Sequence, residues 1–340
     1  MDDIMVSICC MTYNHEKFIE KALKGFLMQK ADFKYEILVH DDASTDKTQE
    51  ILKKYEKKYP ELIKVIYQKE NQYSLGKSPV KNLYNIASGK YIAICEGDDY
   101  WIDEYKLQKQ VDFLEENIDF YATYHNVLVV DENNKINEKE QKCFSLYEEQ
   151  SFEKKEVKTL SLVSQTGSIV ARNFWKELNK KEKEIFIATK CNGDIKLGML
   201  FNYKGKIKHF KEIMSCYRRI YTGDSWNARN KNKNMFFYYF ITCIELKKMI
   251  DSLFGEKLNI IDALNSILMV SFIEALKRPN KENFQVFYKI YKRNEINIIN
   301  FIMWFNKKLF KYTLKKLNLI EANERPLYKG KINLEGKKNL

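Results

Sequence analysis

Residues 1–100 alternate between short apolar runs and longer segments with helical spacing, and this alternation constrains the fold most. Runs rich in apolar and β-branched residues predict strands at 6–11, 35–39, 63–67 and 91–95. Between these runs, apolar residues recur at the three- and four-residue spacing of one helix face. Because strands that alternate with helices form right-handed βαβ units, we predict a parallel sheet flanked by helices.

Polar residues and proline predict where the first helices begin and end. Asn14 is a candidate N-cap of the first helix, and Ser44 or Thr45 of the second, because a side-chain oxygen can accept a hydrogen bond from a free amide. Pro60 marks the end of the second helix. Three further elements are expected after it: a third helix at 80–87 and strands at 120–130 and 167–171. Residues 131–158 are polar and predict a loop.

The excess of basic over acidic residues is confined to the C-terminal part of the chain. The chain has 58 Lys and Arg against 46 Asp and Glu, a formal net charge of +12. Residues 226–340 hold 22 of the basic and 10 of the acidic residues, which leaves 36 of each in residues 1–225. From about residue 230 onward, the apolar residues have helical spacing without intervening strand-like runs. We therefore predict an α/β domain over residues 1–230 and a basic helical region over residues 231–340.

A basic helical region can bind nucleic acid or an anionic membrane. We expect no nucleic acid, because the region has no nucleic-acid-binding motif and its aromatic residues have helix-core spacing. One predicted helix face consists of Ile298, Ile302, Phe305, Leu309 and Tyr312, with lysines roughly opposite. Two interpretations remain open: a helix packed on the α/β domain with a solvated basic face, or a surface that docks on an anionic membrane.

The sequence favours a cytoplasmic protein. Its longest stretch without a charged residue has 13 residues, whereas a spanning helix needs about 20. The first residues lack the composition of a secretory signal peptide. The seven cysteines form no CxxC pair, which favours a reducing compartment. If the basic region docks on a membrane, the protein would lie peripherally on the inner face of the cell membrane.

Polar clusters follow three of the predicted strands, at 12–14, 41–42 and 96–99. Ligands of open α/β sheets bind beyond the carboxyl ends of the strands, so we expect the clusters to converge on one crevice. No GxGxxG motif or P-loop follows the first strand, which disfavours a dinucleotide fold and leaves nucleotide phosphates without a backbone cradle. Adjacent carboxylates such as Asp98 and Asp99 suit Mn²⁺ or Mg²⁺, which bridge diphosphate oxygens.

The order and spacing of these motifs resemble those of the family-2 glycosyltransferases. The resemblance rests on residues 6–14, 41–46 and 96–101 and covers roughly the first two-thirds of the chain. It implies a GT-A fold, which is Rossmann-like with a mainly parallel sheet flanked by helices, followed here by the C-terminal helical region. It also implies a nucleotide-binding half at about 1–105, an acceptor-side half at about 106–230, and inverting transfer from a nucleotide sugar.

On the donor side, the resemblance implies a role for each matching residue. Thr12, Tyr13 and Asn14 would lie under the nucleoside, with Tyr13 stacking near the base. Asp42 would accept a hydrogen bond from the base, which favours uracil and therefore a UDP-sugar. Further donor-side residues complete the site: Lys81 and Arg219 at the diphosphate, Glu96 and Asp98 in the ribose and metal motif, and Asp99 as the direct metal ligand, with Asp98 as a second candidate.

The acceptor side follows from the same resemblance. Asp194, in a Gly-Asp pair, matches the catalytic base, and general-base assistance is worth roughly a hundred- to ten-thousand-fold in rate. Trp101, Thr166 and Gly167 would line the sugar and acceptor side. The expected acceptor is a growing glycan or a polyprenyl-linked one. Asp194 could instead be a helix N-cap, and Trp101 a core residue, which is the usual place of an aromatic side chain.

Two alternatives from other classes remain open. A sugar nucleotidyltransferase can share the fold, but it needs a Gly- and Arg-rich triphosphate loop after the first strand, which residues 9–14 lack. A non-catalytic nucleotide-binding scaffold of a glycan-assembly complex would bind nucleotide and be indifferent to Asp194→Asn. The intact carboxylates at every expected position argue against such decay.

Overall fold

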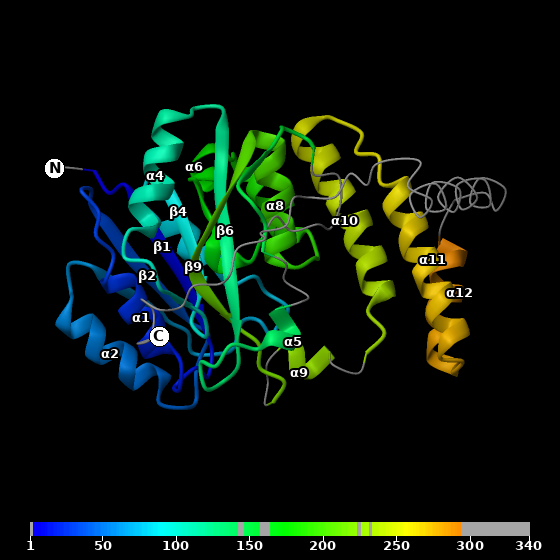
Figure 1. The fold of residues 1–340 in the computed structure, drawn as a ribbon, viewed down its shortest axis with the longest axis horizontal. Helices are drawn as coiled ribbons and strands as arrows, with labels where there is room; N and C mark the ends of the chain where they lie inside the picture. Colours follow the sequence, from blue (N-terminus) through cyan, green and yellow to red (C-terminus); the bar gives the residue numbers. More distant parts are fainter. Residues whose placement is uncertain (1–2, 142–145, 157–163, 223–225, 231–232, 294–340) are drawn as a thin grey trace.

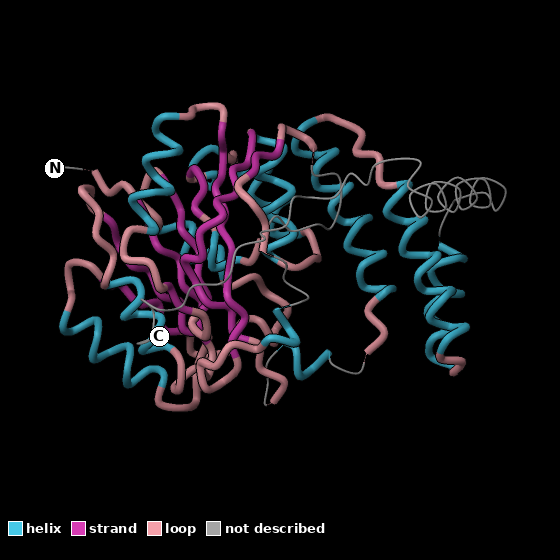
Figure 2. Tube along the Cα trace, in the orientation of Figure 1, coloured by secondary structure: helices cyan, strands magenta, loops and turns pink. Residues whose placement is uncertain are grey.

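The computed structural model describes residues 3–141, 146–156, 164–222, 226–230 and 233–293 (Figures 1 and 2). The first part alternates strands and helices: β1 (Val6–Thr12), α1 (Ile19–Leu27), β2 (Tyr35–Asp41), α2 (Thr48–Lys58), β3 (Ile63–Tyr67), α3 (Val80–Ile86) and β4 (Tyr91–Glu96). The second part comprises β5 (Tyr100–Trp101), α4 (Lys106–Glu116), β6 (Phe120–Val130), α5 (Glu138–Gln141), β7 (Gln150–Phe152), the 3₁₀ helix η1 (Thr166–Ser168), β8 (Val170–Arg172), α6 (Phe174–Glu177), α7 (Lys180–Ala188), α8 (Gly193–Lys204), β9 (Lys206–Arg218) and α9 (Trp226–Asn230). Three helices follow: α10 (Phe236–Phe254), α11 (Ile261–Lys277) and α12 (Lys281–Arg293).

One mixed sheet forms the centre of the molecule. Its strand order is β3-β2-β1-β4-β8-β6-β9-β5, and β7 pairs with β9. Strands β3, β2, β1 and β4 are parallel, as the βαβ pattern predicts. Strand β8 is antiparallel to β4 and β6, whereas β6 and β9 are parallel. The predicted α/β architecture with flanking helices is confirmed, and every antiparallel pairing involves a strand of the second part.

The register of the parallel strands brings the three polar clusters together. Met11 lies opposite Glu96 across the β1–β4 pair, and Thr12 lies opposite Asp41 across the β1–β2 pair. The three strands therefore end at one edge of the sheet, where their carboxyl ends meet. This convergence was predicted from the sequence, and the register confirms it.

The predicted helix caps are wrong. Helix α1 begins at Ile19, and Asn14 instead takes a positive φ of 53° in the loop before it. Helix α2 begins at Thr48, whose amide donates to Oδ1 of Asp46. Ser44 Oγ accepts a hydrogen bond from the Asn14 amide, at 2.9 Å. The polar residues therefore tie the two strand-end loops to each other, a tertiary use that local capping preferences do not reveal.

Two further predictions, both for the second part of the sheet, differ from the structure. The segment predicted as a strand at 167–171 begins as η1 and becomes a strand only at β8. Residues 131–158, predicted as a loop, contain helix α5 and strand β7. Both elements are only three or four residues long, too short for a periodic pattern to indicate them.

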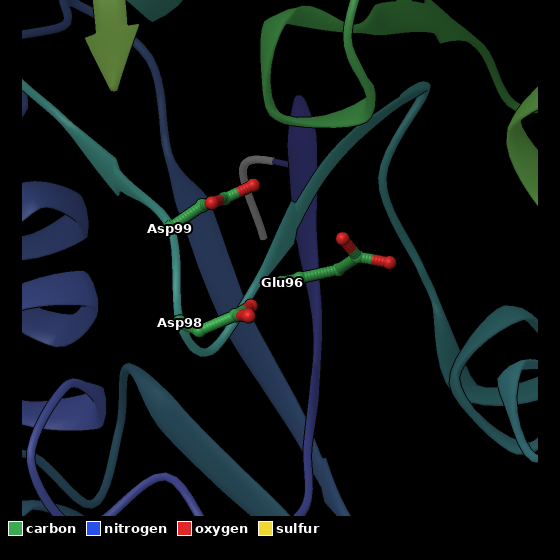
Figure 3. Close-up of side chains that lie close together, drawn as sticks. All are labelled: Glu96, Asp98 and Asp99. Atoms are coloured by element: carbon green, nitrogen blue, oxygen red, sulfur yellow. The ribbon is translucent and has the colours of Figure 1, made fainter. Parts of the chain in front are cut away.

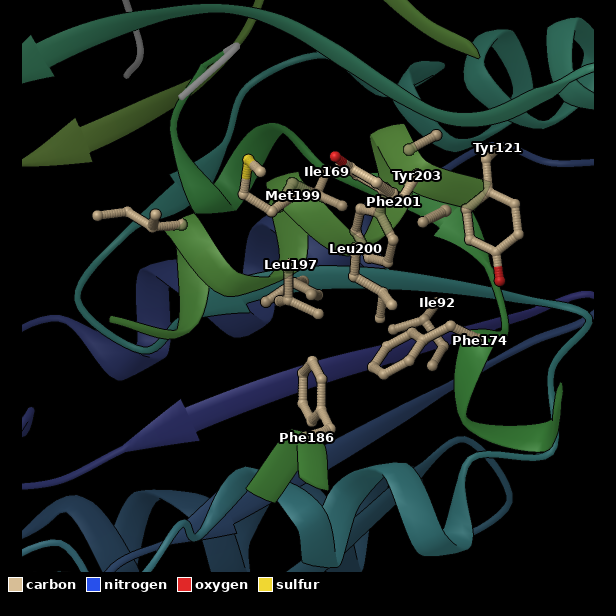
Figure 4. Packing of buried hydrophobic residues seen from close by; sticks show 14 of the residues in the cluster. Ile92, Tyr121, Ile169, Phe174, Phe186, Leu197, Met199, Leu200, Phe201 and Tyr203 are labelled. Atoms are coloured by element: carbon tan, nitrogen blue, oxygen red, sulfur yellow. The ribbon is translucent and has the colours of Figure 1, made fainter. Parts of the chain in front are cut away.

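The larger hydrophobic core lies between the sheet and helices α6, α7, α8 and α10. Its aromatic centre includes Phe174, Phe186 and Phe201, with Leu197 and Leu200 from α8 (Figure 4). Helix α10 adds four buried side chains to the same cluster: Cys243, Leu246, Met249 and Ile250. The basic C-terminal region thus begins with a helix that shares the core of the sheet.

Helices α11 and α12 lie farther from the sheet and pack through α10 (Figure 1). A small cluster of Phe240, Leu268 and Ile290 joins the three helices. In the part of the chain that the structure describes, no helix is long and apolar enough to span a bilayer. The helix face predicted at 298–312 lies outside the described residues, and the domain division at residue 230 stays a prediction.

A close backbone contact fixes α1 against β5. A Cβ atom on Gly25 would lie 2.9 Å from both the amide nitrogen and the carbonyl oxygen of Trp101. Real Cβ atoms do not approach backbone atoms this closely, and neither backbone atom can move alone. Only glycine at this position allows α1 to pack directly on β5, the strand that follows the acidic cluster.

We expect Gly25→Ala to lower the free energy of unfolding by about 1–3 kcal/mol, because the added methyl group overpacks the α1–β5 contact. Urea denaturation measures this change. Lys24→Ala on the same helix is the control, because the Lys24 side chain is 64% exposed and should contribute little. A Gly25→Ala protein as stable as the wild type would contradict the close contact, since alanine otherwise favours a helix.

Candidate functional site

The turn between β4 and β5 places three carboxylates side by side. Glu96, Asp98 and Asp99 each offer one oxygen atom, and these atoms all lie within 4.8 Å of one another (Figure 3). The Asp99 amide donates to the Glu96 carbonyl at 3.1 Å, which closes the turn. The Gly97 amide donates to the Met11 carbonyl at 2.8 Å and joins the turn to β1.

Gly97 allows this turn to lie against the end of β1. A Cβ atom at Gly97 would lie 2.7 Å from Oγ1 of Thr12, a side chain that is only 3% exposed. The Thr12 hydroxyl in turn lies 3.1 Å from Nδ1 of His15. His15 Nε2 is 3.9 Å from Oδ2 of Asp98. A chain of polar contacts thus connects the β1 end to the acidic turn, and His15 is a site residue to which the sequence assigned no role.

Asp99 is the most buried of the three acids, with 1% of its surface exposed. Its Oδ1 accepts a hydrogen bond from the Arg218 amide at 2.7 Å. Its Oδ2 has no hydrogen-bond partner among the described residues. A buried carboxylate oxygen without a donor is costly unless a cation or a ligand satisfies it. Asp99 therefore has the property expected of a direct metal ligand.

Crowding raises the proton affinity of the acidic turn. Burial, with the nearby Asp98 and Asp194 carboxylates, raises the pKa of Glu96 to about 8. Burial and the charges of Asp98 and Glu96 also raise the pKa of Asp99. Because a hard divalent cation binds oxygen ligands and offsets their mutual repulsion, the donor set fits Mn²⁺ or Mg²⁺.

Arg218 holds the acidic turn in place. Its guanidinium group donates to the Asp98 carbonyl at 2.8 Å, to the Asp131 carbonyl at 2.7 Å and to Oδ1 of Asn134 at 2.7 Å. It also lies 4.5 Å from the ring centre of Phe18. The Arg218 side chain thus has a structural role, because its guanidinium group binds three segments of the fold. Sequence reasoning missed this role, because it depends on β9 crossing to pair with β5.

The residues predicted to lie under the nucleoside meet at the ends of β1 and β2. Thr12 is buried, whereas Tyr13 and Asn14 are half-buried. Asn14 Oδ1 accepts a hydrogen bond from the Thr45 amide at 2.8 Å. The Asp42 amide donates to the Thr12 carbonyl at 3.0 Å. The structure therefore brings these predicted residues together along one edge of the sheet.

Asp42 also anchors the loop that follows β3. Its Oδ1 accepts from the Gln72 amide at 2.8 Å and its Oδ2 from the Tyr73 amide at 3.0 Å. The Asn71 side chain donates to the Asp42 carbonyl at 3.1 Å. Each carboxylate oxygen has a second lone pair, so contact with a base remains compatible with these bonds. No motif in the sequence indicates this loop contact.

The two predicted diphosphate contacts differ in their surroundings. Lys81 is exposed in the first turn of α3. Arg219 forms an ion pair with Oε2 of Glu140 at 2.7 Å, and it also donates to Oδ1 of Asn227. Glu140 belongs to α5, inside the segment predicted to be a loop, so the sequence did not indicate this pair.

Trp101 and Gly167 are joined on the predicted sugar and acceptor side. Trp101 is 2% exposed, as its core alternative requires, and its indole Nε1 donates to the Gly167 carbonyl at 2.9 Å. A Cβ atom on Gly167 would lie 3.8 Å from Oδ2 of Asp99. The bond thus holds η1, which includes the half-buried Thr166, beside the acidic turn.

Asp194 lies in the first turn of α8, across from the acidic turn. It is half-buried, and burial raises the pKa of its carboxyl group. Its charge is one of the causes of the raised pKa of Glu96, after burial and the charge of Asp98. The N-cap of α8 is Asn192, so the alternative of Asp194 as the N-cap is wrong. Its carboxyl group does not belong to the cluster of Glu96, Asp98 and Asp99.

The family described as "Glycosyl transferase family 2" matches residues 7–179, which is about half of the chain. Rv1520 of Mycobacterium tuberculosis is 40% identical over 129 residues, 38% of this chain and 36% of that protein. Escherichia coli WfgD is named a UDP-Glc:alpha-D-GlcNAc-diphosphoundecaprenol beta-1,3-glucosyltransferase. It is 33% identical over 135 residues, 39% of this chain and 49% of that protein. The matched segments span less than half the length of these curated relatives.

Among solved structures, one match at low sequence identity covers most of this chain. It is the crystal structure of S. aureus TarS 1-349 in complex with UDP-GlcNAc. The sequence identity is 19%, the alignment covers 80% of this chain and 84% of that chain, and the TM-score is 0.48.

A fully buried lysine lies behind the site. Lys106, the first residue of α4, is 0% exposed, and its Nζ has no hydrogen-bond partner in the described ranges. The Nζ atom lies 4.1 Å from the centre of the Trp101 ring. Burial lowers the pKa of Lys106 to about 7. The ammonium form is therefore costly in the folded protein, because a contact with an aromatic ring only partly replaces its hydration.

We expect protein stability to rise with pH above about pH 7 through Lys106, because the unfolded chain, with a Lys106 pKa near 10.5, then binds more protons than the folded one. Lys106→Met should raise the unfolding free energy most near pH 7, and its advantage should shrink by about pH 9. Urea denaturation across this range measures the difference. Lys109→Met, with a side chain that is 42% exposed, should keep the wild-type pH dependence. A constant advantage of Lys106→Met over the range would contradict the neutral buried lysine.

Proposed function

The chain belongs to glycosyl transferase family 2, and we propose that it is a metal-dependent, inverting glycosyltransferase that uses a UDP-sugar. One observation supports the proposal most: Glu96, Asp98 and Asp99 converge with the ends of β1 and β2, and the buried Oδ2 of Asp99 faces no donor among the described residues. A cluster of acids where the carboxyl ends of parallel strands meet suits a metal-bound diphosphate better than it suits a structural turn.

The metal ligands would come from the acidic turn. Asp99 is the proposed direct ligand, with Asp98 as a second, and Glu96 completes the oxygen set. A bound Mn²⁺ or Mg²⁺ would stabilise the negative charge that develops on the departing diphosphate. Arg218 keeps both aspartates in place through the Asp98 carbonyl and Asp99 Oδ1.

Donor recognition would use the strand-end residues. Tyr13 and Asn14 would contact the nucleoside beside Thr12, and Asp42 would accept the ring N–H of uracil. Because each Asp42 oxygen also accepts an amide of the β3 loop, base binding and loop position would be coupled. Further donor-side contacts are proposed for Lys81 and Arg219 at the diphosphate. A uridine donor is also supported by the name of WfgD, which specifies UDP-Glc.

Asp194 would act as the general base of a single displacement. Its carboxylate takes the proton of the acceptor hydroxyl while the acceptor oxygen bonds to the anomeric carbon. The bond from that carbon to the diphosphate oxygen breaks, and its electron pair leaves with the diphosphate. Attack from the opposite face inverts the anomeric centre, so no enzyme nucleophile is needed. Burial raises the pKa of Asp194, which makes its carboxylate a stronger base.

The acceptor would approach beside Trp101, Thr166 and Gly167. We propose a glycan or polyprenyl-linked acceptor, which the name of WfgD supports through its diphosphoundecaprenol substrate. Such an acceptor is held at a membrane, and the net positive charge of residues 226–340 suits an anionic surface. The acceptor class and the peripheral location on the inner face of the cell membrane are proposed together.

We expect UDP to bind tightly only in the presence of Mn²⁺, and Asp99→Ala to abolish the metal-dependent part of this binding. Calorimetric titration with UDP, with and without Mn²⁺, measures it, with GDP as the nucleotide control. Glu104→Ala is the matched variant, because it removes an acid that is 44% exposed outside the site. Metal-dependent UDP binding by Asp99→Ala at wild-type affinity would refute the ligand assignment, and preference for GDP would refute the uridine assignment.

We expect Asp194→Asn to lower kcat by roughly a hundred-fold or more, because the amide cannot accept the acceptor proton. UDP release from UDP-glucose and UDP-N-acetylglucosamine, with water as the acceptor, measures kcat. The affinity for UDP and Mn²⁺ should remain at the wild-type value, which serves as the folding control. An unchanged kcat would remove Asp194 as the base. A wild-type protein that binds UDP but releases none from either sugar would favour the scaffold alternative.

A further inference from the structure

Helix α10 contributes a side chain to the start of α8, where Asp194 lies. Tyr238 is in the first turn of α10, and its hydroxyl donates a hydrogen bond to Oδ1 of Asn192 at 2.5 Å. Asn192 is the N-cap residue of α8 and directly precedes the Gly193-Asp194 pair. Asn192, Asp194 and Tyr238 all lie beyond residues 7–179, the segment that matches the family. The contact links the start of α8, which carries the candidate base, to the first turn of α10.

The Asn192 side chain does not cap its own helix. An asparagine at an N-cap position commonly accepts a hydrogen bond from an amide in the first helical turn. Asn192 makes no such side-chain bond, and its Oδ1 accepts the Tyr238 hydroxyl instead. Gly193 is exposed, and its added Cβ atom would meet no atom within 4 Å. The start of α8 is thus loosely packed and tied to α10.

Helix α10 is a firm anchor for this bond. Its four core residues, named above, pack in the cluster that also contains Leu197 and Leu200 of α8. Next to its N-terminal end, Asn234 donates to Oδ1 of Asn283 in α12 at 2.7 Å. Because close-packed cores transmit displacement, the position of the Tyr238 hydroxyl is fixed relative to the body of α8.

The same hydroxyl lies in the electrostatic field of the base. Burial raises the pKa of Tyr238, and the charge of Asp194 adds to this increase. Burial and the charge of Asp194 likewise raise the pKa of Tyr124 in β6. Its hydroxyl is buried and has no partner within the described part of the chain. The charge of Asp194 thus acts on side chains of both β6 and α10, and α10 holds the residue before its Gly-Asp pair by a side-chain hydrogen bond.

We propose that Tyr238 is a positioning residue for Asp194, acting through Asn192, so that α10 completes the acceptor side of the site. The inference rests on the proposed function, in which Asp194 is the base. Displacing a reacting group by about 1 Å can cost on the order of a hundred-fold in rate. Loss of one restraint loosens the group without removing it, so a smaller effect is expected.

The first test is Tyr238→Phe, which removes the hydroxyl and keeps the ring. We expect kcat for UDP release from the two UDP-sugars to fall about ten-fold, with the KM for the donor and the affinity for UDP and Mn²⁺ unchanged. Tyr239→Phe, the neighbouring residue on the same helix, should have wild-type kinetics. A general packing defect would instead lower stability and raise KM. Wild-type kcat in Tyr238→Phe, or a rise in KM as large as the fall in kcat, would overturn the proposal.

A double-mutant cycle separates the hydrogen bond from other effects of each residue. Asn192→Ala removes the acceptor, and because the Asn192 side chain does not cap α8, no cap is lost. If the bond is the source of the effect, the Tyr238→Phe/Asn192→Ala protein should be no slower than either single variant. Losses that multiply in the double variant would show independent roles and overturn the positioning mechanism.

A measurement without substrate distinguishes failure of this inference from failure of the proposed function. Hydrogen–deuterium exchange of amides 192–197 should be faster in Tyr238→Phe than in the wild type or Tyr239→Phe. Unchanged exchange would overturn the restraint, whatever the activity. Faster exchange in a protein whose wild type releases no UDP would support the restraint and refute the proposed function.

Discussion

The buried crowding of Glu96, Asp98 and Asp99 is the constraint on which the rest of the site depends. Three like charges within a few ångströms repel one another, so the surrounding structure must hold the turn closed. Arg218 does so from β9 through the Asp98 carbonyl and Asp99 Oδ1. The close approach of Gly97 to the end of β1 holds the same turn in place. The framework therefore keeps a crowded set of acids together, and this crowding raises the pKa values of Glu96 and Asp99.

The local pattern of the sequence predicts the parallel part of the sheet, because each βαβ unit lies within a short stretch of chain. The strands at 120–130 and 63–67 match the observed bounds of β6 and β3. Caps were mispredicted because Asn14 and Ser44 bond to each other's loops, a tertiary contact that competes with local capping. Short elements such as α5 contain too few residues for a periodic signal.

The candidate site divides in the same way. Strand ends converge by topology alone, so the placement of Thr12, Asp42 and the acidic turn could be predicted. The contacts that these residues make with distant segments could not be predicted. Glu140 beside Arg219 and the amides of the β3 loop beside Asp42 depend on loop paths that no motif encodes. Roles inferred from a resemblance identify residues that face the ligand, whereas the residues that hold them come from the individual fold.

The core that α7, α8 and α10 share extends past the boundaries that the sequence suggests. The family match ends at residue 179, and the charge pattern changes near residue 230, yet apolar side chains as far as Ile260 pack in one cluster with the sheet. Residues buried together in one cluster tend to unfold together. The cooperative folding unit thus extends beyond residues 7–179, the segment that matches the family. If relatives exchanged their C-terminal regions during evolution, the new region would have to keep α10 or supply another helix that packs on the same surface.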